Sequence, residues 1–160
     1  MRARGALFAS LVAAIAGGAG CEALQPETGE LRMACVDADS DPGRPVVFRT
    51  EIRPLLDGAV ADTKGCRSCH YASDTAGTRE GFLQTGLDLE RLQTLRRGGR
   101  NTPPERIVVP GKPCSSALVA KLQGTFGGAR MPKGGPYWEP AKIQLVIDWI
   151  AEGAQGAGDE

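Results

Sequence analysis

Apolar side chains recur at three- to four-residue spacing in four stretches of the chain, which is the spacing of one face of an α-helix. The first stretch covers residues 48–60 and contains Pro54. Because proline lacks an N–H and is tolerated in the first turn of a helix, this helix is expected to begin near Thr50 or Glu51. The last stretch, residues 140–153, opens with proline and closes with glycine. It is the clearest helix of the chain, and its apolar stripe consists of Ile143, Val146, Ile147 and Ile150.

Two shorter helices are expected between these stretches. Residues 88–97 carry leucines at helical spacing and are followed by two glycines, which predict the helix end. Ser115 or Ser116 can cap the other helix, whose inward positions are Leu118, Val119 and Leu122. No stretch alternates convincingly between polar and apolar residues as a half-buried strand does. The pattern therefore predicts a mostly α fold of about four helices joined by long Gly/Pro loops.

Length and charge narrow the function classes. The 160 residues allow one ordinary domain with appendages. Lysine and arginine together number 19, as do aspartate and glutamate, so no overall charge attracts nucleic acid or an anionic membrane. The chain contains one histidine, which excludes a metal centre built from several histidines. We therefore expect no nucleic-acid partner.

The first 20 residues have the organisation of a secretory signal peptide. Arg2 and Arg4 precede an apolar run at residues 7–16, and small residues follow before Cys21. The run is too short for a secure transmembrane helix. We expect export to the periplasmic side. Cys21 resembles the cysteine of a bacterial lipoprotein signal, which carries a diacylglycerol and anchors the protein to a membrane; ordinary cleavage after Gly20 is the alternative.

The remainder of the chain divides by composition. Residues 21–46 are rich in Asp, Glu, Pro and Gly and carry few large apolar side chains, so we expect a mobile tether. The folded domain is expected over residues 47–154, and residues 155–160 are expected to form a small disordered tail.

The candidate chemistry lies in the segment 66–70, which reads CRSCH. Cys66 and Cys69 are three residues apart, so both thiols lie on one face of a helical turn, spaced to form thioethers with the two vinyl groups of one haem. His70 follows directly and can ligate the iron from the same side of the ring. This arrangement is the signature of c-type haem attachment, and export fits it because this haem is attached outside the cytoplasm. The expected cofactor is one covalent haem c.

Three other interpretations of these cysteines remain open. In an exported chain the pair can form a disulfide, although a two-residue gap gives a redox-active bridge rather than a stabilising one. A thioredoxin-like motif needs a strand before it, whereas a helix is expected here. A structural zinc site has enough thiolates in Cys35, Cys66, Cys69 and Cys114 but lacks a second closely spaced pair.

Met131 is the candidate for the second axial ligand of the iron. Met33 lies in the expected tether, and Met1 is removed with the signal peptide. Met131 belongs to no apolar helical stripe, so a role as core filler is poorly supported. Pro132 biases it toward an extended backbone, and the surrounding glycines let the main chain approach the ring closely. An open or water-filled sixth position is the alternative.

Two further expectations concern the remaining cysteines and a group of arginines. With Cys21 assigned to lipid and the motif cysteines to haem, Cys35 and Cys114 remain, and we expect a disulfide between them. The basic cluster consists of Arg91, Arg96, Arg97 and Arg100. It is either a solvated helix face or a contact for haem propionates or an acidic redox partner. Tyr71 and Trp138 also have polar tips that can reach a propionate or pack in the core.

The chain resembles the small single-haem cytochrome c domains of bacterial exported proteins, most closely the planctomycete-type domains and their lipoprotein relatives. The resemblance covers residues 47–154 and rests on the helix before the CRSCH motif, on VVPGKP at 108–113, on Arg-Met-Pro at 130–132 and on WIAEGA at 149–154. It implies a small cytochrome c fold in which the haem packs between first and last helices that cross near a right angle. It also implies one-electron transfer.

Two classes of function remain. In the first, the chain is an electron carrier with His70 and Met131 as axial ligands and unidentified redox proteins as partners. In the second, it is a haem-based redox or gas sensor, or an accessory haem subunit of a larger oxidoreductase complex. No paired carboxylates or nucleophile–histidine arrangement supports hydrolysis, since His70 is already committed. We therefore expect an electron-transfer protein rather than an enzyme.

Overall fold

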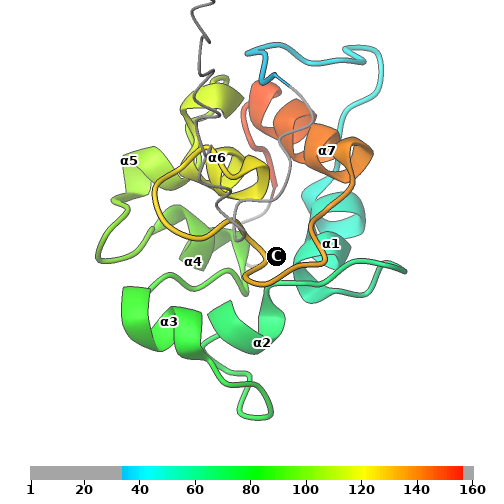
Figure 1. Ribbon diagram of the computed structural model, residues 1–160. Helices are drawn as coiled ribbons and strands as arrows, with labels where there is room; N and C mark the ends of the chain where they lie inside the picture. The colour runs from blue at the N-terminus through cyan, green and yellow to red at the C-terminus, as the bar shows by residue number, and fades with distance from the viewer. Residues whose placement is uncertain (1–33, 157–160) are drawn as a thin grey trace, which may run out of the picture.

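The computed structural model describes residues 34–156 (Figure 1). The expected signal peptide, Cys21, the first part of the expected tether and the last four residues lie outside these described residues. Between residues 34 and 156 the chain forms helices and loops, with one isolated antiparallel bridge at Gly99 and Thr102 and no strand. No helix of this part has the length and apolar character needed to span a membrane. The fold is mostly α, as the apolar pattern predicts.

Seven α-helices, one π-helical turn and one 3₁₀ turn follow one another in the described residues, where the sequence predicts about four helices. Their order is η1 (a π-helical turn, Phe48–Ile52), α1 (Arg53–Asp57), α2 (Arg67–His70), α3 (Glu80–Thr85), α4 (Leu92–Arg96), α5 (Pro104–Ile107), η2 (a 3₁₀ turn, Pro113–Ser115), α6 (Ala117–Gln123) and α7 (Pro140–Ala151). Most of these helices span one or two turns, and long loops join them.

The helix expected over residues 48–60 is shorter and has two parts. Pro54 has no N–H to donate to the carbonyl four residues earlier, and the turn before it is π-helical. The α-helical part then ends at Gly58, whose left-handed φ of 75° costs glycine little. Ala59 therefore lies beyond the helix and is exposed. The buried face consists of Phe48, Ile52, Leu55 and Leu56.

The two helices predicted in the second half of the domain are present. In α7 the expected stripe is buried, and Gly153 follows the helix with a φ of 95°. In α6 the expected inward positions are buried as well. Ser116 precedes α6 but does not cap it. Its hydroxyl instead accepts the Val109 N–H (2.8 Å) and donates to the Lys112 carbonyl (3.1 Å), so it ties the preceding loop together.

The helix expected over residues 88–97 begins later, at Leu92. The Asp88 carboxylate accepts the N–H of Glu90, which forms a turn rather than a helix start. The Arg91 N–H is bonded to the Thr94 hydroxyl instead, at 3.1 Å, in the first turn of α4. Leu92 and Leu95 are fully buried. The prediction therefore identified the buried positions of this helix correctly but placed its start too early.

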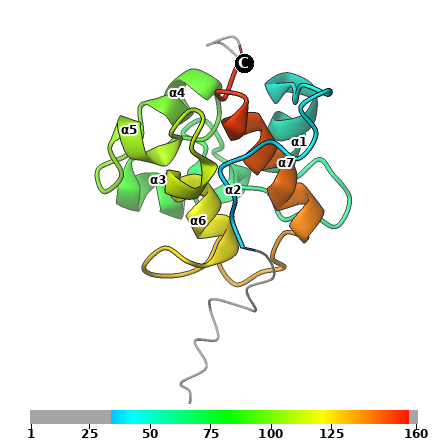
Figure 2. The same cartoon turned by 90° about the horizontal axis from the view of Figure 1, so that it is seen from above.

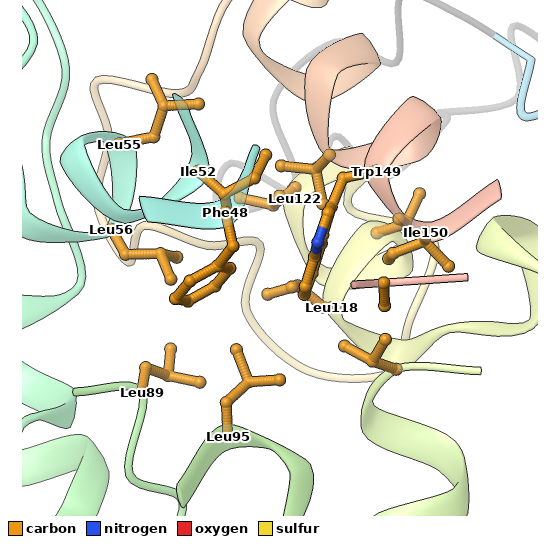
Figure 3. Packing of buried hydrophobic residues seen from close by; sticks show 14 of the residues in the cluster. Phe48, Ile52, Leu55, Leu56, Leu89, Leu95, Leu118, Leu122, Trp149 and Ile150 are labelled. Carbon is orange, nitrogen blue, oxygen red and sulfur yellow. The ribbon is translucent and has the colours of Figure 1, made fainter. Parts of the chain in front are cut away.

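The core joins the first and last elements of the domain. Phe48 and Trp149 face each other with ring centroids 5.3 Å apart and planes tilted by 41°, a favourable arrangement for two aromatic rings. Figure 3 shows this pair between α1 and α6, with Leu118 and Leu122 beside it. Both rings are almost completely shielded from solvent. This contact joins η1 to α7, and Leu118 and Leu122 of α6 lie beside it.

Residues 34–46, the described part of the expected tether, lie against the domain. A disulfide joins Cys35 to Cys114, with an S–S distance of 2.10 Å, and the Cys114 N–H donates to the Asp37 carboxylate (2.8 Å). Ser40 donates from its backbone N–H and its hydroxyl to Asp148 on α7, at 2.9 and 2.7 Å. In Figure 2 this segment, drawn in blue, passes alongside α7. Asp148 faces this segment only once α7 has folded, so the composition of the segment does not reveal the attachment.

Loss of the disulfide is expected to destabilise the domain by about 2–4 kcal/mol, because the bond closes a long loop and restricts the unfolded chain. Cys35 and Cys114 are 79 residues apart in sequence. Urea unfolding of Cys35→Ser, Cys114→Ser and the double variant measures the effect. Since each change breaks the same bond, the double variant should lose no more stability than either single variant. Equal midpoints for all variants and the parent chain would show that the bond contributes nothing.

Candidate functional site

The last four residues of the CRSCH segment form the short helix α2 (Arg67–His70), and Cys66 precedes it; residues 58–65 separate the segment from α1. The Cys66 N–H donates to the Leu56 carbonyl at 2.7 Å, so the motif is joined to the end of α1. The N–H groups of Cys69 and His70 both donate to the Cys66 carbonyl, at 3.2 and 2.8 Å, which closes the helical turn. Cys66 and Cys69 are free thiols in the structure. The turn therefore has the form that the three-residue spacing predicts.

His70 is held in one tautomer. Its Nδ1 lies 3.3 Å from the Leu87 carbonyl oxygen, which can only accept, so Nδ1 carries the proton. Burial lowers the pKa of His70, and the Leu87 carbonyl and the Asp88 charge oppose this shift. The imidazole is thus neutral at physiological pH, and its Nε2 lone pair is free. This is the state in which histidine ligates a metal.

Gly81 on α3 forms a wall against the His70 ring. A Cβ at Gly81 would lie 2.5 Å from both Cε1 and Nε2 of the imidazole and 2.9 Å from its Cδ2. Atoms do not approach so closely, so the ring occupies a space that only glycine leaves open. Gly77 makes a similar approach to the backbone of α2, where a Cβ would lie 2.4 Å from the Ser68 carbonyl oxygen. Helix α3 and its lead-in loop are therefore packed directly against the motif, and Figure 1 shows α2 and α3 side by side.

Tyr71, directly after the motif, anchors it to α1. Its hydroxyl donates to the Asp57 carboxylate at 2.6 Å, and Arg53 Nε donates to the same carboxylate at 3.0 and 3.1 Å. The Arg53 guanidinium also lies over the Tyr71 ring, 5.5 Å from its centroid. Burial, with the Asp57 hydrogen bond and charge as further causes, raises the pKa of Tyr71. The Tyr71 hydroxyl is thus paired with Asp57, which agrees with a role in core packing.

Met131 lies in the loop between α6 and α7, residues 124–139, which we call the Met131 loop. The Met131 N–H donates to the Lys121 carbonyl at 2.9 Å, and the residue is half-buried. Neighbouring Arg130 is buried, with Nε donating to the Leu122 carbonyl (2.7 Å) and its guanidinium over the Tyr137 ring (4.3 Å). The loop is therefore fixed to α6 on one side of Met131.

One cavity of about 360 Å³ brings the predicted residues together. Cys66, Cys69, His70 and Met131 all line it, although Met131 is 61 positions from His70 in sequence. Its apolar wall includes Leu87, Leu89, Ile107, Leu118, Leu122 and Phe126. Lys64, Lys121, Lys133 and Glu80 supply its charged groups. A largely apolar cavity with a few convergent polar groups is typical of a cofactor site.

The donor set in this cavity fits haem c. Two free thiols and a neutral imidazole converge on an apolar cavity, and a thioether lines the same cavity. Gly81 and the Leu87 carbonyl fix the imidazole from two directions. The residues present therefore match two thioether attachments and two axial ligands.

The alternatives for the cysteines fit the structure less well. Cys35 and Cys114 form a disulfide with each other, so a zinc site of four thiolates is not available. Burial, with smaller contributions from Cys69 and Asp57, raises the pKa of Cys66 to about 12. A redox-active thiol of the thioredoxin type needs a lowered pKa instead. No group of three or more metal-ligating His, Cys, Asp or Glu side chains occurs among residues 34–156.

The arginine cluster adjoins the cavity without lining it, since Arg100 lies between Gly99 and Asn101, which both line the cavity. None of its four members lines the cavity, and all four are exposed. Arg96 donates to the Ala154 carbonyl, and Arg100 donates to the carbonyls of Leu83 and Gln84 at 3.2 Å. The cluster is thus exposed and also donates to backbone carbonyls; its contact with haem propionates or an acidic redox partner stays a prediction. Trp138 does not line the cavity either, and its Nε1 donates to the Lys64 carbonyl at 2.8 Å.

Sequence reasoning missed several residues of the site. Gly81, Leu87 and the cavity lysines Lys64 and Lys121 were not singled out. Only a weak signal could have revealed Gly81: a glycine near the start of a short apolar segment can indicate close packing. The role of Leu87 depends on a backbone carbonyl, which no side-chain pattern reveals.

Protein-family models, curated proteins and solved structures were compared with the chain, and none of them matches. The chemistry of the site therefore rests on the chain's own residues.

Proposed function

We propose that this chain is a one-electron carrier that holds one covalent haem c in the cavity between α2, α3 and the Met131 loop. The observation that carries the proposal is the convergence of Cys66, Cys69, His70 and Met131 on one cavity with an apolar wall. The cysteines would form the two thioether links, and the histidine and methionine would be the axial ligands. When bound, the haem iron supplies one-electron chemistry by alternating between Fe(II) and Fe(III).

Different residues of the chain would have different roles in holding this group. The Leu87 carbonyl keeps the proton on Nδ1 of His70, which leaves Nε2 as the ligating atom. The apolar wall excludes water and lowers the local dielectric, which disfavours the more highly charged ferric state. The proposed fold is that of a small cytochrome c domain, with η1 and α7 packed together through Phe48 and Trp149.

We also propose that the protein works outside the cytoplasm, attached to a membrane through a lipid on Cys21. The proposal rests on the signal-like first 20 residues and on the extracytoplasmic attachment of c-type haem. The disulfide between Cys35 and Cys114 agrees with an oxidising compartment. The partners would be redox proteins that reach the haem at the mouth of the cavity.

A haem-based sensor, or an accessory haem subunit of a larger complex, is the second candidate. One observation favours the sensor: Met131 lies in a loop and belongs to no helix, so a gas ligand can displace it at lower cost than a ligand on a helix. An electron carrier keeps both axial ligands in both redox states. A sensor exchanges one of them.

Absorption spectroscopy of the purified full-length chain separates these candidates. We expect a pyridine haemochrome typical of haem with two thioether links, and a reduced form that does not change on addition of CO. Alkylation should find Cys66 and Cys69 blocked. A reduced form that binds CO rapidly would favour the sensor, and alkylation of both thiols in a colourless protein would overturn haem attachment altogether.

A further inference from the structure

The Met131 loop has little backbone support of its own. Residues 124–139 connect α6 to α7 without helix or strand. Near Met131 the loop has a bond from the Met131 N–H to the Lys121 carbonyl (2.9 Å) and a turn from Gly135 to Pro132 (3.0 Å). The peptide bonds before Pro132 and Pro136 are both cis. Side chains add to this support, and one of them is Arg130, which donates to the Leu122 carbonyl at 2.7 Å.

Lys121 on α6 holds the loop on the side that precedes Met131. Its ammonium donates to the carbonyls of Gly127 and Ala129, at 2.5 and 3.3 Å, and lies 5.2 Å from the centroid of the Phe126 ring. Its carbonyl accepts the Met131 N–H. One residue thus makes three hydrogen bonds to a five-residue segment that ends at Met131. Because Lys121 is partly buried, these bonds compete less with water than surface bonds do.

Lys64 holds the loop on the side that follows Met131. Its ammonium donates to the carbonyls of Lys133 and Gly135, at 2.8 and 3.0 Å. Its carbonyl accepts the Trp138 indole N–H at 2.8 Å, so this lysine is fixed at its backbone as well. Lys64 also lies two residues before Cys66, the first cysteine of the motif. It therefore links the motif directly to the loop that bears Met131.

The segment that carries Lys64 is itself attached to α7. The Lys142 ammonium donates to the carbonyls of Ala61 and Asp62, at 3.2 and 3.4 Å. Gly65 packs tightly on the end of α1, since a Cβ there would lie 2.3 Å from the Gly58 nitrogen. The position of Lys64 is thus set by α1 and α7 as well as by the bond from Trp138, which belongs to the loop.

We propose that Lys64 and Lys121 are positioning residues for Met131, which hold its loop from both sides by donating to four loop carbonyls. The role of Met131 as a ligand rests on the proposed function. Lys64 joins Met131 to the side of the cavity formed by Cys66, and Lys121 joins it to α6. Together they keep the thioether at the cavity and slow its replacement by another ligand.

Hydrogen exchange of the full-length protein tests the attachment of the loop without reference to haem. The variants are Lys64→Leu and Lys121→Leu, which remove the donors without adding a ligating atom. We expect amides of residues 127–135 to exchange about tenfold faster in Lys121→Leu, since a charged donor shifts a local opening equilibrium by about this factor. The factor should be smaller in Lys64→Leu because Lys64 is exposed. Lys112→Leu, which removes a charge outside the cavity, is the matched control and should leave these amides unchanged.

Spectroscopy of the same variants tests the positioning of Met131. In the haem-loaded protein, the weak sulfur-to-ferric charge-transfer band should diminish and CO should bind the reduced form faster in both leucine variants. Lys64→Arg, which keeps a charged donor, should restore the band. The milder changes Lys64→Gln and Lys121→Gln serve if a leucine variant does not fold.

The outcomes separate this inference from the proposed function. A protein without covalent haem overturns the proposed function. A haem protein in which both leucine variants keep the parental exchange rates overturns the attachment of the loop. Faster exchange with an unchanged charge-transfer band and unchanged CO binding overturns the positioning role of the two lysines.

Discussion

Replacing Met131 with alanine is expected to lower the reduction potential of the haem protein and to open the sixth position to CO. A thioether is a soft ligand that favours Fe(II) over Fe(III), so its loss stabilises the ferric form. The shift should be on the order of 100 mV or more, within the roughly 0.8 V that axial ligands span. The covalent links remain, because Cys66 and Cys69 are untouched. Potentiometric titration measures the shift, and the sulfur-to-ferric band should disappear with it.

The matched control for this change is Met33→Ala. Met33 belongs to the expected tether, so its loss should alter neither the potential nor the band. In Met131→Ala, water or a cavity lysine would fill the sixth position, and electron exchange should slow because a labile ligand adds reorganisation at each redox step. If the parent protein already binds CO and Met131→Ala changes neither potential nor spectrum, Met131 is no ligand and the sensor becomes the better explanation.

The parts of the fold that the sequence predicted are those with a long apolar stripe. The last helix spans twelve residues with proline at its start and Gly153 after its end, so periodicity and end signals agree. Helices α3 and α5 have six and four residues, too few to show a period. The first helix was predicted with the correct buried positions up to Leu56 but with the wrong start and end, because neither the π-helical turn before Pro54 nor the left-handed turn at Gly58 was recognised.

The residues of the candidate site also fall into those that a local sequence pattern reveals and those that it does not. Cys66, Cys69 and His70 were singled out because the spacing typical of covalent haem attachment is local in sequence, and Met131 because it belongs to no apolar helical stripe; all four line one cavity. The groups that hold these residues act across the fold. The Leu87 carbonyl reaches His70 over 17 positions, and the Lys64 ammonium reaches the Met131 loop over about 70. Such contacts depend on tertiary packing, so no local pattern encodes them.

Gly81→Ala is expected to destabilise the domain and to displace the imidazole of His70. Alanine near the start of a helix is ordinarily better than glycine, by up to about 1 kcal/mol. Here the added Cβ would lie 2.5 Å from Nε2 and Cε1 of the His70 ring, so either the ring or α3 must move. Overpacking of this kind costs about 1–3 kcal/mol. Urea unfolding measures the loss, and the haem spectrum should show a weakened or replaced histidine ligand.

Gly43→Ala is the matched control for this change. Gly43 does not line the cavity, a Cβ there would lie 3.7 Å from its nearest neighbour, Asp41 Oδ1, and its φ lies outside the left-handed region. Alanine at this position should leave the unfolding midpoint and the spectrum nearly unchanged. The direction of the stability change in Gly81→Ala distinguishes two effects. Helix propensity alone would raise the stability of the domain, whereas contact of the added Cβ with the imidazole would lower it. A Gly81→Ala protein that is as stable as its parent, with an unaltered haem spectrum, would show that His70 does not pack against α3 and that the cavity has another shape.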